Sequence, residues 1–113
     1  MYHWNTKKIV AYLSTLPEIE KVYNDGQGGD VDTDNIRCKV RGSDDYIYAC
    51  GFVTGHAGIT NPADCDVEMI EITDQSGNGL QSDDYGVAQV YIMVRQHFVG
   101  AGADVVPYLK DYF

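Results

Sequence analysis

Three aspartates at alternate positions could bind a metal ion. Asp30, Asp32 and Asp34 stand where an EF-hand calcium loop has its first three ligands. The match fails further along, because Arg41 occupies the twelfth position, where the loop needs a bidentate glutamate. The sequence therefore excludes an EF-hand. A looser calcium site that adds Asp25 or backbone carbonyls stays open, and a solvated acidic loop is the simpler alternative.

The cysteines and histidines suggest two other kinds of chemistry. Cys65, with His56 and an aspartate next to the thiol, could supply a nucleophile, a base and an orienting carboxylate. A zinc site would need Cys38, Cys50, Cys65 and His56 to converge from four separate places, without any C-x-x-C pair. The chain also lacks the glycine-flanked nucleophile motif and the paired-histidine metal motif. We therefore predict no catalytic residue, no metal and no cofactor, and we expect that the protein is not an enzyme.

Aspartate and tyrosine are unusually abundant. The chain has 17 acidic and 8 basic residues, a formal net charge of −9, and thirteen aspartates against four glutamates. Nine of its thirteen aromatic residues are tyrosines, which combine a rigid face with a polar tip and are enriched at protein interfaces. Short carboxylates lose little side-chain entropy on binding. The candidate binding residues are Asp30, Asp32, Asp34, Asp44, Asp45, Asp83, Asp84, Tyr46, Tyr48 and Tyr85.

These residues predict a small, non-catalytic protein that binds a protein partner with a basic surface. In an extended segment, carboxylates two residues apart lie about 6 to 7 Å from each other, a spacing comparable with successive phosphates. Such a surface resembles those of phage-encoded anti-CRISPR, anti-restriction and other DNA-mimic proteins. The resemblance implies an inhibitor encoded by a phage or a mobile element. Direct nucleic-acid binding is disfavoured because the net charge repels phosphates, so Arg37, Lys39 and Arg41 are expected on a strand face or beside carboxylates.

Two other classes of function stay open. The first is a structural assembly subunit, because the segment from Leu16 and Pro17 to Tyr23 resembles the opening of phage tail and neck subunits. That resemblance implies a homo-oligomer, with rings formed by pairing of sheet edges. The second is a small-molecule-binding domain or enzyme, which would use the loop at 54–64 with the nearby Tyr46 and Tyr48.

The hydrophobic pattern predicts the elements that must position these residues. Ile9, Val10, Leu13 and Leu16 form one apolar stripe, which predicts a helix over 6–16 with Asn5 as its N-cap. Apolar alternation and runs predict strands at 18–23, 36–41, 46–53, 67–72 and 87–99, the last being the longest, and a short final helix at 104–113. The order predicts an α+β fold in a single domain over 1–113. We expect one mainly antiparallel twisted sheet of four to five strands, an N-terminal helix packed on one face and a short C-terminal helix.

The expected location is the cytoplasm. No apolar stretch approaches the roughly 18 residues that a membrane span needs, and the first residues lack the regions of a signal peptide. Three cysteines are a poor disulfide framework, which favours reduced thiols. We expect no contact with a membrane.

Overall fold

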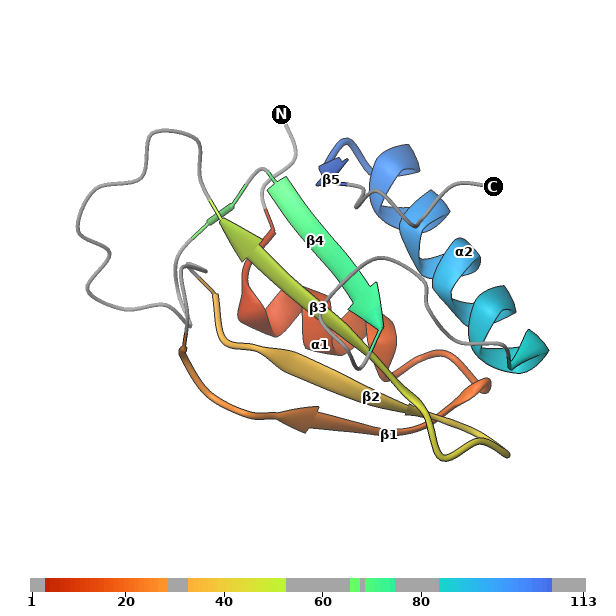
Figure 1. Cartoon of the computed structure of the whole chain (residues 1–113). Helices are drawn as coiled ribbons and strands as arrows, with labels where there is room; N and C mark the ends of the chain where they lie inside the picture. The colour runs from red at the N-terminus through yellow and green to blue at the C-terminus, as the bar shows by residue number, and fades with distance from the viewer. Residues whose placement is uncertain (1–3, 29–32, 53–65, 68, 75–83, 107–113) are drawn as a thin grey trace.

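The computed structural model describes residues 4–28, 33–52, 66–67, 69–74 and 84–106 (Figure 1). The elements in chain order are α1 (Thr6–Leu13), β1 (Ile19–Asn24), β2 (Ile36–Val40), β3 (Tyr46–Phe52), β4 (Met69–Asp74), α2 (Tyr85–Gly100) and β5 (Asp104–Val106). The strands form one sheet in the order β1-β2-β3-β4-β5. The first four pair antiparallel, and β5 pairs parallel with β4. The predicted α+β fold, with its mainly antiparallel sheet and a helix toward each end, is confirmed.

Helix α1 begins and ends close to where the sequence predicts. The Asn5 side chain caps it by accepting a hydrogen bond from the backbone N–H of Lys8 at 3.0 Å. The helix ends at Leu13, ahead of Pro17, which lacks the N–H that a helix interior requires. Ile9 and Leu13 lie one turn apart and are fully buried, so α1 packs through one apolar face.

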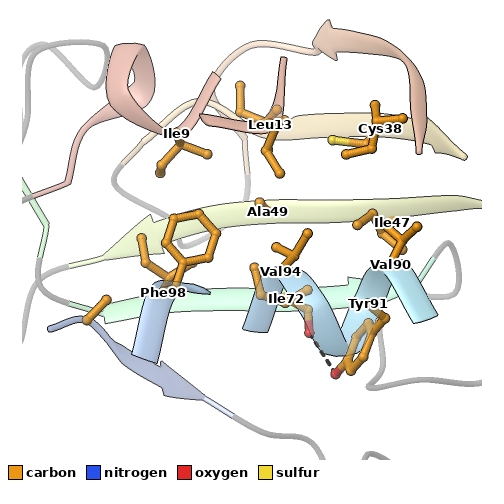
Figure 2. Packing of buried hydrophobic residues seen from close by; sticks show 14 of the residues in the cluster. Ile9, Leu13, Cys38, Ile47, Ala49, Ile72, Val90, Tyr91, Val94 and Phe98 are labelled. Atoms are coloured by element: carbon orange, nitrogen blue, oxygen red, sulfur yellow. Dashed lines mark hydrogen bonds between the residues drawn. The ribbon is translucent and has the colours of Figure 1, made fainter. Parts of the chain in front are cut away.

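Both helices cover the same face of the sheet. Figure 2 shows side chains from the two helices directed toward the middle strands, where they form a single hydrophobic cluster. From α1 and α2 it includes Ile9, Leu13, Val90, Val94 and Phe98, and from the sheet Cys38, Ile47, Ala49 and Ile72. The opposite face of the sheet therefore carries the alternate residues of each strand.

The central strand β3 needs a glycine where another segment crosses it closely. A Cβ atom at Gly51 would collide with the side chain of Val67 and would lie 3.2 Å from the carbonyl oxygen of Met69. Val67 is held there by an antiparallel bridge to Trp4. The glycine at position 51 thus allows the Trp4 and Val67 segments to close over β3.

Residues 87–99, predicted to be a strand, lie within α2, so that prediction is wrong. The N-cap of α2 is Asp84. Its carboxylate accepts hydrogen bonds from the backbone N–H of Gly86 at 2.8 Å and of Val87 at 3.3 Å. The buried residues have the three- and four-residue spacing of a helix face: Val87, Val90, Tyr91, Val94 and Phe98. Strand propensity is a weak preference, and here burial of this face outweighs it.

The predicted final helix is also wrong at its beginning, because Asp104–Val106 forms strand β5. The turn after α2 explains the change of direction. Gly102 has a φ of +92°, and the backbone N–H of Ala103 donates to the carbonyl of Phe98, a pattern that closes helix ends. The chain then runs back along β4, and the rest of the predicted helix lies outside the described residues.

Candidate functional site

Acidic residues from three separate segments meet at one end of the sheet. Asp44 and Asp45 lie in the hairpin between β2 and β3, and Asp84 caps the neighbouring end of α2. The Ser43 side chain hydrogen-bonds to Asp84, which links the hairpin to the helix. That bond and those from the backbone N–H groups of α2 hold the pKa of Asp84 below its usual range. Glu18 directly precedes β1. We call Glu18, Asp44, Asp45 and Asp84 the acidic end.

An apolar groove of about 540 Å³ opens at the acidic end, between the strands and the first half of α2. Its volume lies within the range of small-ligand pockets. It is lined by Pro17, Glu18, Val40, Arg41, Gly86, Gln89, Val90 and Met93. Val40 and Val90 form its base, since each is only 2% exposed. One carboxylate, that of Glu18, therefore lines an apolar cleft, and the other residues of the acidic end lie in adjoining segments.

Among the described residues that line this groove, Arg41 carries a positive charge. One nitrogen of its guanidinium already has a hydrogen-bond partner. Its Nε donates to the carbonyl of Pro17 at 2.9 Å, and its backbone N–H donates to the carbonyl of Glu18 at 2.8 Å. These bonds hold the end of β2 against the beginning of β1. The guanidinium keeps its single positive charge, which is less than the four negative charges of the acidic end.

The face of the sheet opposite the two helices, which we call the open face, carries a cluster of cations and tyrosines on β1, β2 and β3. Arg37 pairs with Asp25 through Nε at 2.9 Å, and its guanidinium lies 4.3 Å from the ring centre of Tyr23. Lys39 lies 3.4 Å from a carboxylate oxygen of Glu20. The expected pairing of Arg37 and Lys39 with carboxylates is confirmed. These two cations are therefore already paired with carboxylates from or beside the neighbouring strand β1.

Four of the ten predicted binding residues lie at or beside the acidic end: Asp44, Asp45, Asp84 and Tyr85. Tyr46 follows Asp45, but its ring lies 4.9 Å from the Arg37 guanidinium, on the other face of the sheet. Tyr85 is 78% exposed at the first position of α2. Asp34 lies at the opposite end of β2, whose five residues span about 17 Å, and Tyr48 is on the open face opposite Arg37. Asp30, Asp32 and Asp83 lie outside the described residues. The ten residues do not all meet in one place.

The zinc interpretation that combines Cys38 with Cys50 is excluded by the register of the sheet. Cys38 pairs with Ile47, three positions before Cys50 on β3, so the two thiols point to opposite faces. Burial raises the pKa of each thiol to about 12, which leaves both protonated and unreactive at neutral pH. No group of three metal-ligating side chains occurs in the described ranges. Cys65, His56 and the calcium candidates Asp30 and Asp32 lie outside those ranges.

The sequence predicts a strand at 87–99, and a strand there gives neither the groove nor the orientation of α2. One local feature of the sequence favours a helix in this segment. Asp84 is a good N-cap, and the residues after it have apolar positions at helical spacing as well as at strand spacing. An N-cap at Asp84 predicts a helix that carries Gly86, Gln89, Val90 and Met93.

Comparisons with known proteins add no functional information, since no family model, curated protein or solved structure matches this chain. In the described ranges, no helix has both the length and the apolar character to cross a membrane.

Proposed function

We propose that this protein is a non-catalytic binding protein that takes a basic segment of another protein at its acidic end. The observation that supports this proposal is an apolar groove lined by Glu18 at the end of the sheet where Asp44, Asp45 and Asp84 also lie. Apolar grooves give affinity by burying an anchor side chain, and charges at the rim give specificity and faster association. The fitting partner has an apolar side chain flanked by lysine or arginine.

The charges of the described residues favour this type of partner. Glu18 lines the groove, Asp84 binds the backbone of the lining residue Gly86, and Arg41 is the cation among the lining residues. Asp44 and Asp45 add two charges in the adjoining hairpin. Enzymes that handle nucleic acids expose basic surfaces of this kind. An inhibitor of such an enzyme, encoded by a phage or a mobile element, is the specific form of the proposal.

The experiment is a titration of the ¹⁵N-labelled protein with a synthetic amphipathic peptide of lysine and leucine, followed by NMR chemical shifts. A scrambled peptide of the same composition is the control. We expect shifts at 42–45 and 84–90 that are larger with the amphipathic peptide and weaken as salt rises, because ions screen exposed charges. Shifts confined to the open face, or binding indifferent to salt, would contradict the proposal.

Two matched substitutions separate local attraction from general net charge. Asp44→Asn and Asp34→Asn each remove one negative charge, but from opposite ends of β2. Asparagine at position 34 can still accept the hydrogen bond that Asn24 donates to Asp34. We expect Asp44→Asn to raise the Kd about two- to fivefold, as for an exposed charge pair, and Asp34→Asn to leave it nearly unchanged.

A structural assembly subunit is the second candidate. It is supported by the opening of the chain, since α1 ends ahead of Pro17 and β1 begins at Ile19. The edge strand β1 is a poor place for contact between copies, because it has a register irregularity between Ile19 and Lys21 and carries charged Glu20 and Lys21. Such features protect sheet edges from pairing. Contact between copies is better sought on α2.

A further inference from the structure

Helix α2 exposes a line of apolar side chains on its outer face. Tyr85, Ile92 and Val99 are 78%, 50% and 57% exposed, and they are the large apolar side chains that lie exposed in the described part of the chain. They stand seven residues apart, so they follow one line along the helix. Gln89 and Gln96 are exposed between them. We call these five residues the α2 stripe.

The stripe lies on a helix without acidic residues. The 16 residues of α2 contain no aspartate or glutamate, although the chain has 17 acidic residues in 113. Two copies that each carry a net charge of −9 repel one another wherever their carboxylates approach. An approach along α2 brings no carboxylate of the helix itself into contact, and it covers exposed apolar surface.

The α2 stripe is also self-complementary. Apolar and amide side chains alternate from Tyr85 to Val99, and the order is the same in both directions from Ile92. In a two-fold interface the same patch contacts itself with reversed direction. We propose that a second copy of this chain covers the stripe, with the two α2 helices antiparallel and the two Ile92 side chains close to the axis.

The size of the surface sets the strength of this association. Sixteen residues make a helix about 24 Å long, and a width of about 10 Å gives a footprint of about 240 Å². Standard interfaces bury about 800 Å² per partner. The dimer is therefore weak and forms at high protein concentration. Salt strengthens it, because ions screen the repulsion between the two acidic chains.

The first experiment is sedimentation velocity on the whole chain, from micromolar to millimolar concentration, at low and high salt. We expect a 12.5 kDa monomer at low concentration and a shift toward twice that mass at high concentration, favoured by salt. A monomer at every concentration and salt level would overturn the inference, and so would rings of more than two copies. This salt dependence is opposite to that of peptide binding at the acidic end, so the two proposals fail separately.

Charge substitutions at the axis give the decisive test. Ile92→Glu and Ile92→Lys should each raise the dimer Kd at least tenfold, since like charges then face each other across the axis. An equal mixture of the two variants should recover association at low salt, because unlike charges then meet. The control is Ala11→Glu, which places an acid on the exposed side of α1. No effect at Ile92, or no recovery in the mixture, contradicts a two-fold contact there.

Discussion

Substituting Gly51 by alanine should destabilise the fold, although alanine restricts the unfolded chain more than glycine does. That restriction alone would favour Gly51→Ala by about 0.5 to 1 kcal/mol. The structure opposes it, because the new Cβ would collide with the Val67 side chain and lie 3.2 Å from the carbonyl oxygen of Met69. Overpacking of a close-packed core costs about 1 to 3 kcal/mol. The midpoints of these two ranges leave an expected net loss of about 1 kcal/mol in the free energy of unfolding.

The Val67 side chain provides the test of this explanation. Val67 is fully buried, and Val67→Ala removes two methyl groups, which costs about 2 kcal/mol. The removed groups include the atom that the new Cβ at position 51 would strike. The double variant should therefore be more stable than the sum of the single effects by about 1 kcal/mol. The contact with the Met69 carbonyl persists, so the recovery is partial.

Urea unfolding followed by Trp4 fluorescence measures all four proteins of this cycle. Trp4 is the single tryptophan of the chain, is 6% exposed and pairs with Val67, so it reports on this region. Equal slopes with denaturant would show that stability, and not compactness, has changed. The reasoning is refuted if Gly51→Ala is neutral or stabilising. Effects that add within about 0.3 kcal/mol refute it as well.

Three other predictions concern Tyr91, His97 and the two buried cysteines. Tyr91→Phe removes the buried hydrogen bond from the tyrosine hydroxyl to the carbonyl of Ile72, at 3.2 Å (Figure 2). The substitution should lower the free energy of unfolding in urea by about 1 kcal/mol. An unchanged free energy would contradict the bond. Burial lowers the pKa of His97 from its usual 6.5, so the unfolded chain binds the proton more tightly. Stability from this group should be complete above about pH 6.5 and decline as the pH falls, and thermal melts of His97→Gln should lack that part of the decline. In a variant whose third cysteine is serine, Cys38 and Cys50 should resist alkylation at pH 8 until the protein unfolds, because their pKa is about 12. Rapid alkylation of the folded protein would contradict their burial.

The parts of the fold that the sequence predicts correctly depend on local signals. The Asn5 cap and the apolar spacing of Ile9 and Leu13 specify α1 within a few residues of chain. The alternation around Cys38 specifies β2, and the glycine turn at Gly42, with a φ of +80°, specifies the hairpin. The parallel pairing of β5 with β4 joins segments that are distant in sequence, and no local pattern reports it.

In the candidate site too, local features are visible in the sequence, whereas contacts between distant segments are not. The acidic pair Asp44 and Asp45 is visible in the sequence as part of a turn, but its neighbour Asp84 reaches it through the contact with Ser43. That contact joins a hairpin to a helix cap about 40 residues later, and it depends on how α2 packs against the sheet. The groove is likewise formed by packing of separate elements, so composition alone could not locate it.

The same residue, Ile92, explains both the wrong strand prediction for α2 and the proposed contact on the outer face of that helix. Val90, Ile92 and Val94 alternate as in a strand, and that alternation exists because Ile92 is apolar. The helix buries Val90 and Val94 but leaves Ile92 half exposed. A helix that covers a sheet typically carries polar residues on its outer face, and a polar residue at position 92 would also have removed the strand pattern. The apolar residue that misled the secondary-structure prediction therefore has no role in the core of the monomer. Its exposure, at the centre of a stripe without acidic residues, is what association with a second copy would explain.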